Sequence, residues 1–95
     1  MKLSELASVH IGMEDADFWL TRRSDDTNVG KPVRTFNKEN IGIKIKEKGI
    51  LNPDYLYYLF IHLHNVGYFK KISNGTLSLV NIKVSDIQNI AFKCN

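Results

Sequence analysis

Two histidines, His62 and His64, suggest chemistry most directly in this sequence, because imidazole nitrogens bind metal ions. They fall in a stretch whose apolar spacing predicts a helix, and on a helix residues i and i+2 point about 200° apart. We therefore expect no metal site there. Serine, histidine and aspartate all occur, but no nucleophile elbow, phosphate loop or zinc-protease motif accompanies them. The sequence predicts neither an enzyme nor a bound cofactor.

Basic side chains are the other candidates, and they are unevenly distributed. Residues 1–30 contain three Lys or Arg and six Asp or Glu, whereas residues 31–95 contain ten and four. A basic segment attracts nucleic acid, because its contacts with phosphates release condensed counterions. A chain of 95 residues with 43% hydrophobic and 24% charged residues is typical of one globular domain, which we assign to residues 1–95.

Targeting and redox signals are sparse. The longest mainly apolar stretch, residues 55–63, is too short to span a bilayer, and the first residues lack the apolar run of a signal peptide. We therefore expect a cytoplasmic protein without a membrane partner. The single cysteine, Cys94, cannot form an internal disulfide and is expected to be a free thiol.

A central helix is the clearest element that could position these side chains. Asn52 can cap it, Pro53 suits its first position, and Asp54 favours the positive end of the helix dipole. Gly67 is a plausible stop. The sequence predicts a helix from Pro53 to about Asn65, whose buried stripe comprises Leu56, Leu59, Phe60 and Leu63.

Shorter elements surround this helix. Alternation and turn-forming residues predict strands at 9–11, 16–22, 41–46, 77–82 and 90–92, an exposed loop at 24–32 and a turn at Asn74-Gly75. Single helical turns are expected near residues 3–7, at 68–72 and after Ser85 or Asp86. Strands before and after a central helix, without regular β-α alternation, indicate an α+β domain with a small mixed or antiparallel sheet packed on that helix plus short helices.

The second half of the chain contains the segment Leu51 to Leu59, in which Pro53 is followed by tyrosines and leucines. This segment is similar to the Pro-x-Tyr-Leu-x-Tyr-Leu helix start of target-recognition domains in type I restriction-modification specificity subunits, a family that the chain resembles. Gly75-Thr76, the polar strand from Leu77 to Ile82 and Ser85 to Ile90 follow in the family's order, and Lys2 to Ala7 is similar to its opening segment. The Ile90-Ala91-Phe92 segment lacks the family's proline-rich ending, so the chain resembles a recognition domain without the spacer helix.

The resemblance implies sequence-selective binding of double-stranded DNA. In such domains polar side chains read base edges while lysines and arginines hold phosphates. The residues that it assigns to DNA are Arg22, Arg23, Lys31, Arg34, Lys44, Lys46, Lys70, Lys71, Asn74, Thr76, Ser78, Asn81 and Lys83. The arginines border the 24–32 loop, which could enter a groove.

Structural alternatives exist for each of these groups. Asn74 could simply shape a turn, Thr76 could simply start a strand, and Asp25 and Asp26 could pair with the neighbouring arginines in a solvated loop. The lysines could form the charged outer face that any exposed element needs. The alternative function is a protein-interaction module that binds or inhibits methyltransferase or restriction subunits, and a homodimer also stays open.

Overall fold

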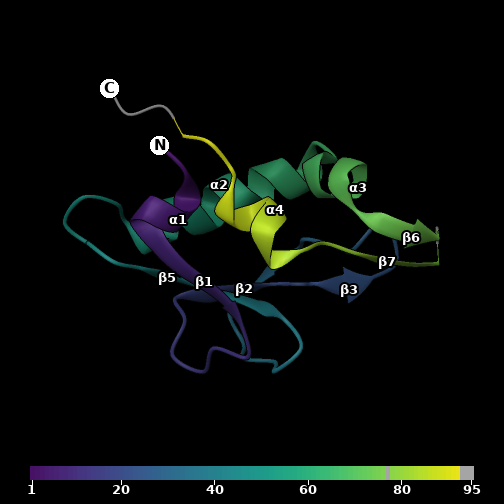
Figure 1. The fold of residues 1–95 in the computed structure, drawn as a ribbon, viewed down its shortest axis with the longest axis horizontal. Helices are drawn as coiled ribbons and strands as arrows, with labels where there is room; N and C mark the ends of the chain where they lie inside the picture. Colours follow the sequence, from purple (N-terminus) through teal and green to yellow (C-terminus); the bar gives the residue numbers. More distant parts are fainter. Residues whose placement is uncertain (77, 93–95) are drawn as a thin grey trace.

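Two antiparallel sheets and four helices form an α+β fold, as the sequence predicts (Figure 1). The computed structural model describes residues 1–76 and 78–92. Leu77, the expected first residue of a strand, and Cys94, the expected free thiol, lie outside the described residues. The elements are α1 (Leu3–Leu6), β1 (Ala7–Ile11), β2 (Phe18–Leu20), β3 (Arg23–Ser24), β4 (Pro32–Val33), β5 (Ile41–Ile45), α2 (Pro53–Asn65), α3 (Tyr68–Ile72), β6 (Asn74–Thr76), β7 (Leu79–Asn81) and α4 (Val84–Gln88).

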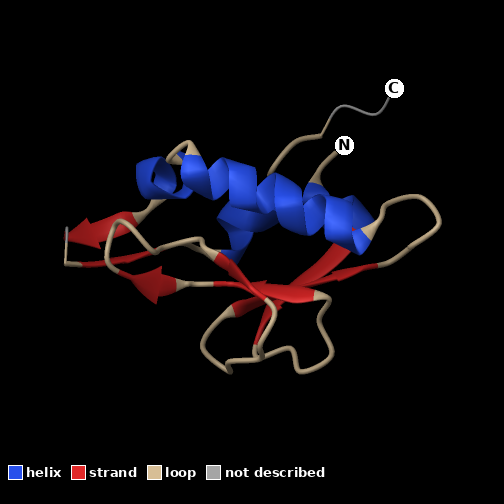
Figure 2. Cartoon of the chain, turned by 180° about the vertical axis from the view of Figure 1, so that it is seen from behind, coloured by secondary structure: helices blue, strands red, loops and turns tan. Residues whose placement is uncertain are grey.

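The larger sheet has four strands in the order β1-β5-β2-β4. Its helix-facing side chains alternate along the strands, so that Phe18 and Leu20 of β2 and Ile41, Ile43 and Ile45 of β5 are buried. Helix α2 lies over this side of the sheet (Figure 2). The ring of Phe18 meets those of Tyr57 and Phe60 edge to face, with ring centroids 5.4 and 5.8 Å apart.

Helix α2 begins and ends where its local sequence predicts. The side chain of Asn52 accepts hydrogen bonds from the backbone N–H groups of Asp54 and Tyr55, at 2.8 and 3.3 Å. Gly67, just past the helix, has the left-handed φ of 82° that favours glycine. The predicted stripe is only half buried: Leu56 and Phe60 are buried, whereas Leu59 and Leu63 pack against the edge of the core.

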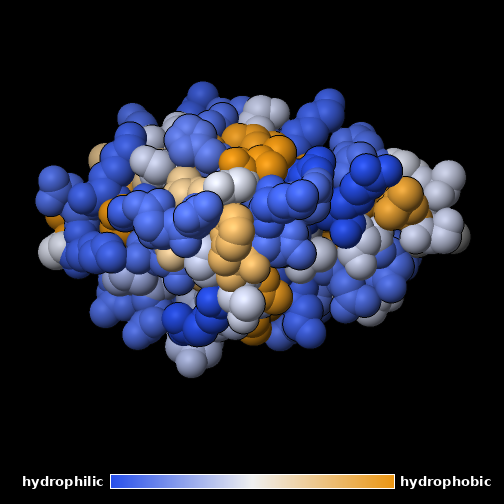
Figure 3. Space-filling model, turned by 90° about the horizontal axis from the view of Figure 1, so that it is seen from below, coloured by the Kyte–Doolittle hydropathy of each residue, from blue (hydrophilic) through white to orange (hydrophobic). Residues whose placement is uncertain are grey.

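Two loops cover the other side of the larger sheet, and they contain residues 12–17 and 34–40. The indole N–H of Trp19 donates to the carbonyl of Met13 at 2.7 Å, and Phe36 packs edge to face on the same indole. Figure 3 shows this side of the molecule, where hydrophilic side chains surround apolar surface near the middle. The larger sheet is therefore covered on both sides.

The smaller sheet has three strands in the order β3-β7-β6. The predicted turn at Asn74-Gly75 is wrong, because both residues belong to β6 and pair with β7. The hairpin instead connects Thr76 to Leu79. Gly75 has a φ of 122°, and a Cβ at this position would collide with the backbone of Leu79. Glycine is thus required by the strand pairing itself.

The two ends of the described chain lie side by side. The predicted strand at residues 90–92 is wrong: only a single bridge joins Lys2 to Ala91, and the amino group of Met1 donates to the carbonyl of Phe92 at 3.0 Å. Helix α4 packs against β1 and starts at Val84, one residue before the predicted cap. No helix within residues 1–76 and 78–92 is long and apolar enough to cross a membrane.

Candidate nucleic-acid interface

One side of the smaller sheet presents a row of polar side chains. Arg23 of β3 pairs with Asn81 of β7, and Asn81 pairs in turn with Asn74 of β6. Because directly paired residues point to the same side of a sheet, with Cβ atoms about 4.5–5.5 Å apart, these three side chains lie next to one another. The neighbouring row is directed inward, since Val80 is buried in the core. The row combines one guanidinium with two amides.

The same side continues at both ends of β7. Burial alternates from Leu79 to Lys83, so that Val80 and Ile82 are buried while Leu79 and Lys83 are exposed. Thr76 of β6 pairs with Leu79 near the end of the hairpin. We call this surface the polar face, and its members are Arg23, Asn74, Thr76, Leu79, Asn81 and Lys83.

Free hydrogen-bonding groups distinguish the polar face. Within residues 1–76 and 78–92, the side chains of Arg23, Asn74, Asn81 and Lys83 form neither a hydrogen bond nor an ion pair with the protein. Thr76 has only a weak contact, in which its hydroxyl lies 3.4 Å from that of Ser78. Contacts within the described residues therefore do not use these side-chain groups, and the groups are available to bind a ligand.

Most other candidate cations are occupied by the protein itself. Arg22 donates to the carbonyl of Glu39 at 2.6 Å and to its carboxylate at 3.1 Å. Arg34 pairs with Asp54 at 3.2 Å while its guanidinium lies 3.9 Å from the centre of the Tyr57 ring. A ligand would have to displace these partners, so we do not include Arg22 and Arg34 in the candidate site.

Lysines of the larger sheet are occupied as well. Lys44 pairs with Asp15 at 2.5 Å, and Lys46 donates to the carbonyl of Ser4 at 3.0 Å. The hydrogen bond and charge of Lys44 lower the pKa of the Asp15 carboxyl, and Asp15 raises the pKa of Lys44 in the same way. Both side chains are solvated, and the pair helps to fix the 12–17 loop on β5.

The lysines of α3 differ from each other. Lys70 pairs with Asp26 at 3.4 Å, whereas Lys71 is exposed and has no ion-pair partner among the described residues. Helix α3 ends two residues before β6, so Lys71 lies next to the polar face in sequence. Lys31 is also exposed without an ion pair in the described part of the chain, beside β4.

The 24–32 loop is folded against the helices. Val29 is buried in the core, and Gly30, with a φ of 79°, approaches the ring of Phe69 so closely that a Cβ would overlap it. His64 of α2 lies 2.8 Å from the carbonyl of Thr27. The expected groove-entering loop is therefore anchored along its length.

The alternative, in which Asp25 and Asp26 pair with the neighbouring arginines, is wrong. Asp25 accepts hydrogen bonds from the backbone N–H groups of Thr27 and Asn28, and Asp26 pairs with Lys70. Both carboxylates serve the loop's own structure or its contact with α3. This leaves the guanidinium of Arg23 free.

Leu79 is the residue of the polar face that sequence reasoning missed. The sequence predicts its strand, but the interpretation assigns no direction to the individual side chains. The alternation of buried Val80 and Ile82 with Leu79, Asn81 and Lys83 was a readable signal, because a strand turns successive side chains to opposite sides.

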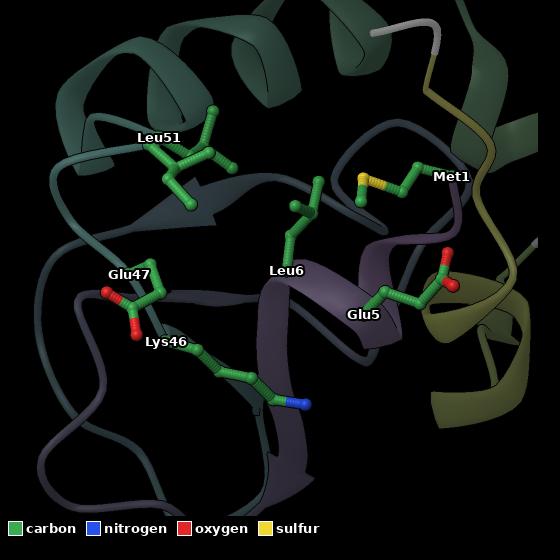
Figure 4. A pocket seen from close by; sticks show the side chains of 7 residues that line it. Met1, Glu5, Leu6, Lys46, Glu47 and Leu51 are labelled. Carbon is green, nitrogen blue, oxygen red and sulfur yellow. The ribbon is translucent and has the colours of Figure 1, made fainter.

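An apolar pocket lies at the other end of the molecule. It has a volume of about 130 Å³, and Leu6 and Leu51 face one another across it while Lys46 and Glu47 lie at its rim (Figure 4). Ile50, which also lines it, is 77% exposed. Tyr55 and Tyr58 are exposed on α2. This apolar surface is separate from the polar face.

Neither a search for metal ligands among the described residues nor comparison with known proteins adds a further site. Within residues 1–76 and 78–92 no three His, Cys, Asp or Glu side chains are grouped so that they could hold a metal ion. Comparisons of the chain with protein-family models, with curated protein sequences and with solved structures find no match.

Proposed function

We propose that the protein is a sequence-selective double-stranded DNA-binding module whose polar face is the binding surface. The observation that carries this proposal is the gathering of unpaired cations and amides on one side of the smaller sheet. Positive groups without internal partners can replace counterions around phosphates, and free amides can pair with base edges. Sequence-selective binding of double-stranded DNA is also what the resemblance to target-recognition domains implies.

The shape of the smaller sheet supports the same proposal. The hairpin of β6 and β7 lies at one end of the molecule, far from α1 and the N-terminus (Figure 1). A two-stranded ribbon fits the major groove of B-form DNA, which is about 12 Å wide. Arg23 lies beside Asn81 across the sheet, and Lys83 follows Asn81 by two residues along the chain, so both positive groups flank the amide pair and could contact phosphates.

Titration of duplex DNA by fluorescence anisotropy at several salt concentrations tests this function. Replacing Arg23 and Lys83 together with Ala should lower the affinity for all duplexes and reduce the salt slope by about 0.9 for each lost phosphate contact. Lys38→Ala is the matched control, since it removes an exposed positive charge from a loop of the larger sheet. Equal losses in the control and the double variant would contradict a DNA site on the polar face.

A second candidate function rests on the apolar pocket. An exposed apolar side chain such as Ile50 at the edge of an apolar pocket is typical of surfaces that bind other proteins, and α2 adds the exposed rings of Tyr55 and Tyr58. We propose methyltransferase or restriction subunits, or a second copy of the chain, as alternative partners at this surface. Light scattering would detect a homodimer. Complexes with such subunits that form without DNA and are lost on Tyr58→Ala would favour the interaction module.

A further inference from the structure

We infer that the β6–β7 hairpin recognises A·T base pairs through the major groove. This inference rests on the proposed function, because it names the bases that the polar face would bind. It starts from the two amides of Asn74 and Asn81, which are paired across the hairpin and free of partners among the described residues.

Amide chemistry favours adenine at these positions. An asparagine side chain offers one acceptor and one donor, which match the N6–H donor and the N7 acceptor of adenine in the major groove. Guanine presents two acceptors at its edge, and it would leave the amide oxygen facing another acceptor. Two adjacent amides therefore favour adenine over guanine, and the polar face has no carboxylate that could accept from the N4–H donor of cytosine.

Apolar groups at the end of the hairpin favour thymine. Leu79 is 48% exposed, although it belongs to a strand, and its partner Thr76 carries a methyl group. Together they form a small apolar area beside the amides. The distinguishing major-groove feature of thymine is its C5-methyl group, which leucine and threonine methyl groups can contact.

The spacing of these two pairs fits the DNA helix. Asn81 and Leu79 are two residues apart on β7, which is about 6.8 Å along a strand. Base pairs are stacked about 3.4 Å apart, so this interval equals two steps. A hairpin lying along the groove would place the amides on one base pair and the methyl groups two steps away. Arg23, on the third strand, lies beyond the ribbon and would meet a phosphate.

Binding of the full chain to two 20-base-pair duplexes tests the inference. Their flanks are identical, and their central ten pairs are either all A·T, containing every A/T step, or all G·C. Fluorescence anisotropy should show about tenfold or greater preference for the A·T duplex. Replacing adenine with 7-deazaadenine in the A·T core should remove most of this preference, because it deletes the N7 acceptor without altering the minor groove. Replacing thymine with uracil should weaken binding several-fold.

Protein variants assign the effect to the hairpin. Asn81→Ala should remove most of the A·T preference while affinity for the G·C duplex stays within a factor of two. Asn65→Ala, which removes an exposed amide from α2, should leave the preference intact. If Asn81→Ala proves unstable, the modified duplexes decide the question with the unaltered protein.

The outcomes separate this inference from the proposed function. Salt-dependent binding of both duplexes with equal affinity would overturn the A·T inference and leave DNA binding intact. A preference that survives 7-deazaadenine would overturn it as well, because the minor groove or the DNA shape would then be the feature recognised. No binding to either duplex at low salt would refute the proposed function and this inference together.

Discussion

The larger and the smaller sheet of this protein use their outward sides in opposite ways. In the larger sheet α2 covers one side, and two loops anchored by Trp19 cover the other. Several charged side chains beside it form ion pairs, as Lys44 does with Asp15 and Lys48 does with Asp17 at 2.8 Å. In the smaller sheet the inner side joins the same core through Val80, whereas Arg23 and the amides of Asn74 and Asn81 have no partner among the described residues.

This difference separates structural roles from available ones. A side chain that is buried or paired stabilises the fold, so folding alone is enough to explain why that residue type is present. A free polar side chain at the surface contributes little to stability, because water already satisfies it. The smaller sheet is therefore the part of the molecule where substitutions can change binding without changing the fold.

The largest contrast should come from one buried and one exposed residue. Phe18→Ala removes a ring packed between Tyr57 and Phe60 and should lower the free energy of unfolding by roughly 3–5 kcal/mol. Asn81→Ala should change the free energy of unfolding by less than about 0.5 kcal/mol, because the Asn81 amide forms no hydrogen bond with the described residues. Urea unfolding followed by circular dichroism measures both. A comparable loss of unfolding free energy in the two variants would show that Asn81 on the polar face also stabilises the fold.

Adjacent arginines test the same contrast at constant chemistry. Arg22 is bound to Glu39 through two contacts and its side chain is 22% exposed, whereas Arg23 is exposed and unpaired in the described part of the chain. Arg22→Ala should lower the free energy of unfolding by about 1 kcal/mol and leave the salt slope of DNA binding unchanged. Arg23→Ala should do the reverse, leaving stability unchanged and reducing the slope by about 0.9.

Thermal unfolding and salt-dependent anisotropy on the same two variants check this crossed pattern. Each variant is the control for the other, since both lose one arginine at neighbouring positions. If both variants lower the salt slope of DNA binding equally, Arg22 contacts DNA despite its internal contacts with Glu39.

Local signals explain what could be predicted from the sequence. The bounds of α2 were predicted because its cap, its proline and its terminal glycine act within a few residues of each helix end. The α+β class followed from alternation around that helix. The Asn74-Gly75 turn failed because glycine serves equally well in a strand whose neighbour approaches closely, and here Gly75 lies against the backbone of Leu79.

Non-local contacts explain the rest of the fold and of the candidate site. Arg23 and Asn81 are far apart in sequence, and nothing local indicates that their strands pair. Asp26 and Lys70 are equally distant, so the sequence could not show that this lysine is occupied while Lys71 is not. Of the thirteen residues assigned to DNA, the structure gathers Arg23, Asn74, Thr76, Asn81 and Lys83 on the polar face.

The smallest expected effect concerns the solvated pair of Asp15 and Lys44 on the larger sheet. The pKa of Asp15 is lowered in the folded protein by the hydrogen bond and charge of Lys44, so the carboxylate contributes stability above its ordinary pKa of 3.8. That contribution is lost as the pH falls through the lower folded pKa. The pKa of Lys44 is raised, so its contribution is present below 10.5 and is lost as the pH rises through the folded pKa. The pair therefore stabilises the protein only between the lowered pKa of Asp15 and the raised pKa of Lys44 in the folded state.

Melting temperature against pH measures this effect in the unaltered protein, in Asp15→Asn and in Glu14→Gln. The Asp15→Asn variant should melt slightly lower at neutral pH, and the difference should vanish in acid, where the Asp15 carboxyl is protonated. High salt should also reduce it, because the pair is exposed to solvent. Glu14→Gln removes a neighbouring exposed carboxylate without an ion pair among the described residues, so it should follow the unaltered protein. A difference in melting temperature that persists in acid would show that Asp15 acts through loop geometry. The charge pair would then not stabilise the larger sheet.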